Sequence, residues 1–129
     1  MSLRVLIVDD SPPFREAARA VLEARGYVVA GEADSARAAL ECARRLLPDA
    51  VLLDVDLPDG NGFGVCAGLM RCEPPPAVLL TSADDLRADP RVQRSGATGF
   101  LPKQHLARAR LAEFWAGTPG PASATSPAT

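Results

Sequence analysis

Short, uninterrupted apolar runs recur along the chain and alternate with longer mixed segments. The runs cover residues 5–8, 28–30, 50–53, 77–80 and 99–101, and several are rich in valine. Continuous apolar runs of this length are typical of strands that are buried on both faces of a parallel sheet. The pattern therefore predicts five parallel strands.

The segments between these runs carry apolar residues at helical spacing. Two of them place their apolar residues on one helix face: Phe14, Ala17, Ala18 and Val21 in the first, and Ala36, Ala39, Leu40, Ala43 and Leu47 in the second. A third helix over residues 63–71 must end before the three prolines of "EPPP". A last helix is predicted over residues 104–116, with Ala107, Leu111, Phe114 and Trp115 on its apolar face.

The segment "DDLRADPRVQRSG" is the least regular of these connections. Leu86 and Val92 are its only aliphatic residues larger than alanine, and Pro90 lies in its middle. Proline inside a helix removes a hydrogen bond and clashes with the preceding turn. We therefore expect a short or irregular helix here.

Strands that alternate with helices indicate one α/β domain, a three-layer (βα)5 doubly wound parallel five-stranded sheet with right-handed crossovers. Ligands in such folds bind at the carboxyl ends of the strands. We place this domain at residues 1–116. Residues 117–129 contain three prolines and no aliphatic residue larger than alanine, which predicts a disordered tail or a truncated linker.

Composition and charge narrow the function. The chain is 47% apolar and 23% charged, with a net charge of −2, and its arginines are spread along the sequence. This predicts a soluble protein without direct nucleic-acid binding. The chain shows neither a signal peptide nor an apolar run of membrane-spanning length, so we expect a cytoplasmic protein that does not bind membranes. Cys42, Cys66 and Cys72 form no CxxC pair and are read as reduced residues.

Acidic residues follow two of the predicted strands. Asp9 and Asp10 end the first, and Asp54 ends the third. Three neighbouring carboxylates repel one another unless a cation lies among them, and an all-oxygen ligand set favours Mg²⁺. An alternative for Asp9 and Asp10 is that they only favour the start of the following helix.

Two further polar features follow the fourth and fifth strands. Thr81 and Ser82 offer hydroxyl groups, and Lys103 is the only lysine in a chain with thirteen arginines. A lysine ammonium is a compact point charge that serves well as a phosphate partner. The ends of the strands therefore combine acids, a hydroxyl and one cation.

The motifs "VLIVDDS", "LLDVDLPDGNGF", "LLTSA" and "GATGFLPK" together resemble the receiver domain of bacterial two-component response regulators, over about residues 3–116. That resemblance implies the flavodoxin-like strand order 2-1-3-4-5. It also implies that Asp54 accepts a phosphoryl group from a histidine kinase or a phosphotransfer protein. The chain would then be no enzyme beyond its own phosphorylation and dephosphorylation.

The same resemblance implies roles for the other site residues. Asp10, Asp54 and the backbone carbonyl of Asp56 would bind Mg²⁺, with Asp9 acting mainly through water. Lys103 would pair with the phosphoryl oxygens. The switch pair would be Ser82, with Thr81 as the fallback hydroxyl, and Phe100, which would move inward on phosphorylation.

Some features differ from the usual family pattern, and some alternatives stay open. Pro102 precedes Lys103 instead of following it, and Asp56 and Asp84 add acids that we expect to change the lifetime of the phosphoryl group.

The chain could be the receiver of a longer DNA-binding transcriptional regulator, and whether phosphorylation makes it form a homodimer stays open. "DVD" also resembles haloacid-dehalogenase-type phosphatases, and the layers resemble flavodoxin, but the order of the acids argues against the first and the acidic "DDSPPF" against the second. His105 has no second ligand at useful spacing and is read as a solvent-facing residue.

Overall fold

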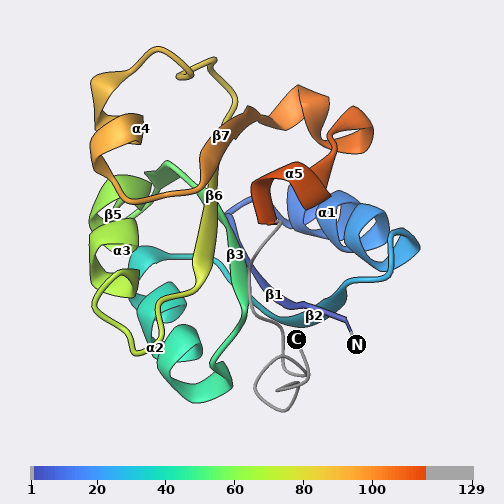
Figure 1. The fold of residues 1–129 in the computed structure, drawn as a ribbon, viewed down its shortest axis with the longest axis horizontal. Helices are drawn as coiled ribbons and strands as arrows, with labels where there is room; N and C mark the ends of the chain where they lie inside the picture. Colours follow the sequence, from blue (N-terminus) through green and yellow to red (C-terminus); the bar gives the residue numbers. More distant parts are fainter. Residues whose placement is uncertain (1, 116–129) are drawn as a thin grey trace, which may run out of the picture.

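The centre of the molecule is the predicted five-stranded parallel sheet (Figure 1). The computed structural model describes residues 2–115. The strands are β1 (Arg4–Val8), β2 (Val28–Ala33), β3 (Ala50–Asp54), β6 (Ala77–Ser82) and β7 (Gly99–Pro102). Their order is β2-β1-β3-β6-β7, and every neighbouring pair is parallel. Counting only these strands, the order is 2-1-3-4-5, so the predicted topology is confirmed.

Helices cover both faces of this sheet. They are α1 (Pro12–Ala24), α2 (Ala36–Leu46), α3 (Gly62–Leu69), α4 (Pro90–Arg94), the 3₁₀ helix η1 (Lys103–Arg108) and α5 (Leu111–Trp115). One core packs α2, α3 and α4 against the sheet, and the other packs α1, η1 and α5 against its opposite face. The result is the three-layer arrangement that the alternation of strands and helices predicts.

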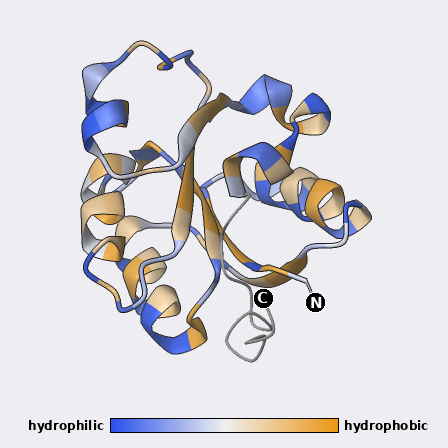
Figure 2. Ribbon diagram, viewed as in Figure 1, coloured by the Kyte–Doolittle hydropathy of each residue, from blue (hydrophilic) through white to orange (hydrophobic). Residues whose placement is uncertain are grey.

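The strands read as continuous apolar runs because their residues alternate between these two cores. In β1, Leu6 and Val8 belong to the core under α2 and α3, whereas Val5 and Ile7 belong to the core under α1. All four are at most 1% exposed. Figure 2 shows the same pattern, with apolar strands between helices that carry hydrophilic residues on their outer sides. Burial on both faces is what removes the polar–apolar alternation from these strands.

Side-chain caps fix where the first two long helices begin. Ser11 Oγ accepts a hydrogen bond from Phe14 N at 3.4 Å, and Ser35 Oγ accepts one from Ala38 N at 3.0 Å. Serine is favoured at such positions because it satisfies a backbone N–H group that has no partner within the helix. The caps therefore place α1 directly after the acid pair Asp9 and Asp10.

Two short strands between β3 and α3 were not predicted. β4 (Asp56–Leu57) and β5 (Gly60–Asn61) form a small antiparallel pair. The turn between them carries Asp59, whose carboxylate accepts hydrogen bonds from Ala36 N and Arg37 N. The hairpin therefore joins the end of β3 to the start of α2.

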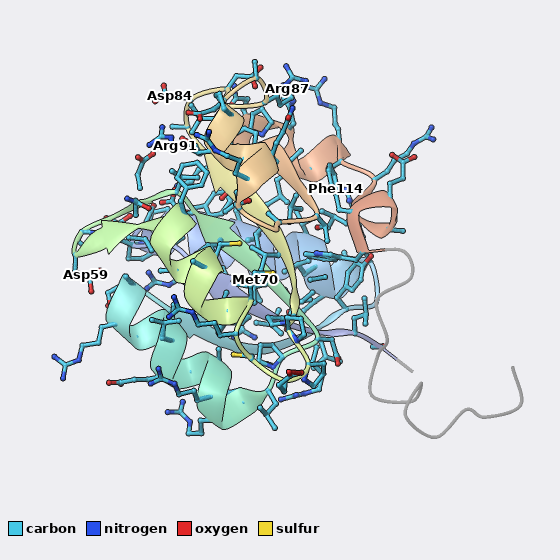
Figure 3. All side chains as sticks on the ribbon, turned by 60° about the vertical axis from the view of Figure 1, so that its left-hand side comes forward. Asp59, Met70, Asp84, Arg87, Arg91 and Phe114 are labelled. Carbon is cyan, nitrogen blue, oxygen red and sulfur yellow. The ribbon has the colours of Figure 1, made fainter. Side chains whose placement is uncertain are left out.

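The segment before β7 is irregular, as predicted. α4 contains only five residues, and Pro90 is its first. Arg87 and Arg91 form salt bridges with Asp85 and Asp89, and both arginine side chains are more than half exposed. Figure 3 shows these arginines and Asp84 at the outer edge that carries α4. Few apolar residues are available to hold this segment against the sheet.

The continuous helix predicted over residues 104–116 is wrong. The chain forms η1, becomes extended at Ala109, and then forms the short helix α5. Leu106 is buried and Ala107 is exposed, which contradicts the predicted apolar face at that position. The Arg25 guanidinium donates to the carbonyls of Ala107 and Ala109, and thereby satisfies backbone groups that the break leaves without helical partners.

Residue 116 and the predicted tail at 117–129 lie outside the described residues. Among residues 2–115, no helix combines the length and apolar character that crossing a bilayer requires.

Candidate functional site

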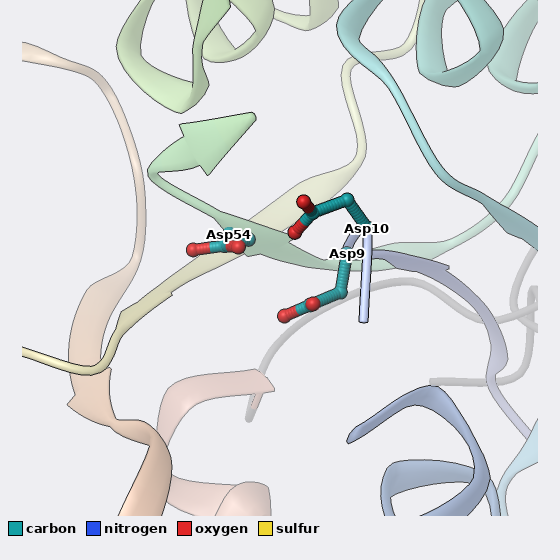
Figure 4. Close-up of side chains that lie close together, drawn as sticks. All are labelled: Asp9, Asp10 and Asp54. Atoms are coloured by element: carbon teal, nitrogen blue, oxygen red, sulfur yellow. The ribbon is translucent and has the colours of Figure 1, made fainter. Parts of the chain in front are cut away.

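Three carboxylates converge at the carboxyl end of the sheet. Asp9 follows β1 directly and is 0% exposed, Asp54 ends β3 and is 2% exposed, and Asp10 is exposed. One carboxylate oxygen from each of the three lies within 4.8 Å of the other two (Figure 4). The predicted convergence is confirmed, and the donor set is one that a hard divalent cation accepts.

Lys103 lies among these acids. Its Nζ atom is 2.6 Å from Asp9 Oδ2 and 3.3 Å from Asp54 Oδ2, and it also lies 4.7 Å from the centroid of the Phe14 ring. Burial lowers the pKa of the Lys103 ammonium, but the two carboxylates outweigh burial and hold that pKa above its ordinary value. The single lysine of the chain is therefore a fixed positive charge in contact with Asp54.

Asp54 is held in an environment that opposes its negative charge. Its Oδ1 atom accepts a hydrogen bond from Asp56 N at 3.1 Å, and its Oδ2 atom accepts one from Lys103 Nζ. Burial nevertheless raises its pKa to about 6, with a further contribution from Asp9, while Asp56 N and Lys103 act in the opposite direction. A buried carboxylate with a perturbed pKa at a strand end is typical of a functional group.

The two candidate hydroxyl groups lie on opposite faces of the sheet. Thr81 is in register with Asp54, and Leu80, the residue before it, is in register with Phe100. Residues in register share a face and successive residues alternate, so Thr81 shares the face of Asp54 and Ser82 shares that of Phe100. Within residues 2–115, Thr81 Oγ1 is buried without a hydrogen-bond partner.

Ser82 makes two hydrogen bonds that the sequence did not reveal. Its Oγ atom donates to Asp56 Oδ2 at 3.1 Å and accepts from Asp84 N at 3.1 Å. Asp56 therefore contacts Asp54 through its backbone and Ser82 through its side chain. No sequence signal pairs Asp56 with Ser82, because Asp56 follows β3 and Ser82 ends β6.

Phe100, the expected switch aromatic, lies in the core of the domain. The ring is only 6% exposed and belongs to the core under α2 and α3. The structure thus gives the position of the ring in one state, and the role of Phe100 as the switch aromatic stays a prediction.

Arg15 is a further residue at the site that sequence reasoning missed. It donates from Nη1 to the backbone carbonyl of Asp9 at 2.7 Å and from Nε to Glu32 Oε1 at 3.0 Å. Arg19 binds the other oxygen of Glu32. A basic residue early in the helix that follows the acid pair was the available signal. Its contact ties the acidic turn to α1 and β2.

Comparison with known proteins agrees with this geometry. A family model described as the response regulator receiver domain matches residues 5–114. The chain belongs to this family. The match covers most of the chain, and it supports neither the phosphatase nor the flavodoxin alternative.

Relatives of this receiver domain include whole proteins and parts of longer ones. It is 44% identical over 103 residues to the transcriptional regulatory protein NarL of Mycobacterium tuberculosis, covering 78% of this chain and 48% of NarL. It is 35% identical over 104 residues to the chemotaxis protein CheY of Thermotoga maritima, covering 80% of this chain and 87% of CheY. The chain spans only 27% to 49% of the length of several curated relatives, which include a protein-glutamate methylesterase from Alkalilimnicola ehrlichii.

Solved structures show the same fold. The signal receiver domain of NarL from Mycobacterium tuberculosis superimposes with a TM-score of 0.76 at 39% identity, covering 89% of this chain and 98% of that domain. The three-layer receiver fold is therefore shown by sequence and by structure.

Gly62 packs against the backbone at the end of β3, next to Asp54. Gly62 N donates to Val55 O at 2.7 Å, and a Cβ atom at Gly62 would lie 2.5 Å from Asp54 O and 2.8 Å from Val55 Cα. The backbone cannot yield as easily as a side chain does. We expect Gly62→Ala to lower the free energy of unfolding by about 1–3 kcal/mol, in the range of other overpacking substitutions.

Gly64→Ala is a matched control in the same helix. Its Cβ would meet only Asn61 Oδ1, at 3.9 Å. Alanine is favoured over glycine in a helix, so this variant should be as stable as the parent or more stable by up to about 1 kcal/mol. Urea denaturation of both variants measures the difference, and equal losses would contradict a specific role for Gly62.

Proposed function

We propose that Asp54 is the phosphoacceptor of this receiver domain and that a sensor histidine kinase or a phosphotransfer protein is the donor. The single observation that carries the proposal is the position of Asp54, a buried strand-end carboxylate in contact with Lys103 and within a cluster of three acids. An Asp54 oxygen attacks the phosphorus atom, an O–P bond forms, and the N–P bond to the histidine breaks. The imidazole leaves and takes up a proton from solvent, and Asp54 becomes an acyl phosphate.

Positioning and charge neutralisation are the main requirements of phosphoryl transfer. Asp54 has a pKa of about 6, so above that pH the oxygen is ionised and can attack. Lys103 lies beside the attacking group and would balance the charge of the phosphoryl oxygens. The phosphoryl group adds about −1.5 to −2 charge at neutral pH.

We propose Mg²⁺ as the cofactor. The three carboxylates are close enough to share one ion, and oxygen-only ligands suit it. Asp10 and Asp54, with the backbone carbonyl of Asp56, would hold it directly, and Asp9 would act mainly through water. When bound, Mg²⁺ would neutralise charge on the transferring phosphoryl group.

We assign Ser82 as the hydroxyl that contacts the phosphoryl group, with Thr81 as the fallback. Ser82 shares a sheet face with Phe100 and reaches the Asp54 region through Asp56.

We also propose a cytoplasmic location for the domain, because its kinase and its output partner would act there.

The first experiment is the intact mass of the chain after incubation with Mg²⁺ and a small acyl-phosphate or phosphoramidate donor. We expect the parent to gain one phosphoryl group and Asp54→Asn to gain none. Asp59→Asn is the matched control, because Asp59 lies on the same "DLPDG" segment but accepts hydrogen bonds at the start of α2. Phosphorylation of Asp54→Asn, or none of the parent with any donor, would contradict the proposal.

A second candidate is that this receiver regulates an attached DNA-binding domain. It is supported by the relatives that are transcriptional regulators and of which this chain spans about half the length, such as NarL. The mass of the natural protein, captured from its source with an antibody against this domain, tests the candidate. A mass near 13.5 kDa would argue against it.

A further inference from the structure

The Ser82 hydroxyl already uses its single proton in this structure. A serine hydroxyl has one proton to donate. Ser82 donates that proton to Asp56 Oδ2 and accepts a hydrogen bond from Asp84 N, each at 3.1 Å. While the bond to Asp56 persists, Ser82 cannot donate to any other acceptor.

Asp56 is held beside both groups that phosphorylation involves. Its backbone N–H group donates to Asp54 Oδ1 at 3.1 Å, which fixes the residue next to the phosphoacceptor. Its carboxylate extends from an exposed position to Ser82 on the neighbouring strand end. The backbone contact does not depend on the side chain, so the two interactions can be separated by substitution.

The carboxylate of Asp56 has no salt-bridge partner to compete with Ser82 among residues 2–115. Arg91 is the neighbouring cation, but it forms its salt bridge with Asp89 at 2.8 Å. The hydrogen bond from Arg91 to Asp89 raises the pKa of the Arg91 guanidinium, and Asp56 adds only a weaker contribution. Asp56 therefore remains free to accept the Ser82 proton.

The Phe100 ring is already buried, so its burial gives no sign of a change on phosphorylation. The Asp56 to Ser82 hydrogen bond, by contrast, uses the proton that a phosphoryl group on Asp54 would need. The two acceptors exclude each other.

We propose that the Asp56 side chain is a positioning residue that withholds the Ser82 hydroxyl from the phosphoryl group. This inference rests on the proposed function. Phosphorylation must break one charge-assisted hydrogen bond before it gains another, so Asp56 lowers the phosphorylated fraction and shortens the lifetime of the phosphoryl group. The direction of the Asp56 effect, which the sequence left open, is therefore set by this contact.

Removal of the acceptor gives the expected effect. With a small donor at a subsaturating concentration and Mg²⁺, Asp56→Ala should raise the ratio of phosphorylated to unphosphorylated chain about three- to tenfold, as expected for the loss of one partly exposed hydrogen bond of ordinary net strength. Asp56→Asn keeps an acceptor oxygen and removes the charge, so its rise should be smaller. Equal rises in the two variants would show that charge alone is responsible and would overturn the proposal.

A double-mutant cycle with Ser82→Ala separates the contact from general charge effects. In the Ser82→Ala background the Asp56→Ala substitution should change the ratio less than about twofold, because the hydroxyl for which the groups compete is absent. The same rise in both backgrounds would overturn the inference while leaving the proposed function intact. Thermal unfolding of each variant confirms that the fold is retained.

A readout without phosphate completes the test. In the unphosphorylated chain, the amide proton resonance of Asp84, which donates to Ser82 Oγ, should shift in Asp56→Ala and stay close to the parent position in Asp56→Asn. An unchanged resonance in Asp56→Ala would overturn the proposal. Failure of both the parent and Asp56→Ala to accept a phosphoryl group would instead overturn the proposed function, and the inference with it.

Discussion

Lys103→Met should lower the free energy of unfolding by about 3 kcal/mol at pH 7 without Mg²⁺. Removing one partner from a buried ion pair leaves an uncompensated charge and typically costs about 3–5 kcal/mol, and the partial exposure of Lys103 places our value at the lower end. Here two carboxylates lose their cation, since Lys103 Nζ lies 2.6 Å from Asp9 Oδ2 and 3.3 Å from Asp54 Oδ2. Urea denaturation measures the loss.

The loss should depend on pH with a defined sign. The pKa of Lys103 is raised by its carboxylate partners, so its contribution to stability is present throughout the neutral range and disappears only at strongly alkaline pH. At acidic pH the carboxylates become protonated and no longer need the cation. The difference between parent and variant should therefore shrink as the pH falls below about 6, where Asp54 takes up its proton.

Two controls distinguish this effect from a general loss of a surface charge. Arg110→Met removes an exposed salt bridge to Glu113, in which the arginine side chain is 83% exposed, and should cost less than about 1 kcal/mol. Mg²⁺ should restore part of the stability of Lys103→Met, because it supplies positive charge to the same acids. Equal losses for the two variants would contradict the proposed role of Lys103 as the counterion of the site.

Asp54→Asn should have the opposite effect and stabilise the protein at pH 7. The pKa of Asp54 is about 6 against an ordinary value of 3.8, chiefly because burial disfavours its charge. Each pKa unit corresponds to about 1.4 kcal/mol, so removing the charge gains at most about 3 kcal/mol. The gain is largest for a protein measured without Mg²⁺, because the ion would stabilise the charged carboxylate of the parent.

The sign of the pH dependence follows from proton binding. Between pH 3.8 and about 6 the folded parent holds a proton on Asp54 that the unfolded chain has released, so parent stability falls as the pH rises through this range. The advantage of Asp54→Asn should therefore appear as the pH rises through this window and be complete above about 6. Urea midpoints at several pH values between 4 and 8 measure it.

Asp59→Asn is the matched control for this prediction. Hydrogen bonds from Ala36 N and Arg37 N hold the pKa of Asp59 below its ordinary value, so its charge favours the folded state. Its replacement should cause a small loss at pH 7 that disappears as the pH falls below the ordinary range of an aspartate. A gain from both aspartate substitutions, or from neither, would contradict the environment assigned to Asp54.

The fold and the convergence of acids could be predicted because both depend on local pattern. Strands buried on both faces read as continuous apolar runs, and parallel strands bring their carboxyl ends to one edge of the sheet. Asp9, Asp54 and Lys103 each follow or end such a run, so their meeting required no knowledge of packing. The single lysine among thirteen arginines marked the remaining partner.

The C-terminal helix could not be predicted in the same way. Its apolar spacing permits one continuous helix, but the chain extends at Ala109, and Arg25 from α1 binds the carbonyls that the break exposes. A partner more than eighty residues away in the sequence therefore shapes this segment. Intrinsic helix preference is too weak to override such tertiary contacts.

The apolar pattern by itself determined the five strands and the positions of the acids and the lysine at their ends, whereas the strand order and the expectation that Asp54 accepts a phosphoryl group came from the resemblance of the motifs to receiver domains. Only the tertiary structure decided that Arg15 holds the Asp9 backbone, that Phe100 is already buried, and that Asp56 accepts the Ser82 proton. The physical reason is that buried strands, and the polar residues that follow them, produce a repeating pattern of apolar runs and polar positions in the sequence. A hydrogen bond between side chains twenty-six residues apart depends on angles and distances that no local pattern encodes.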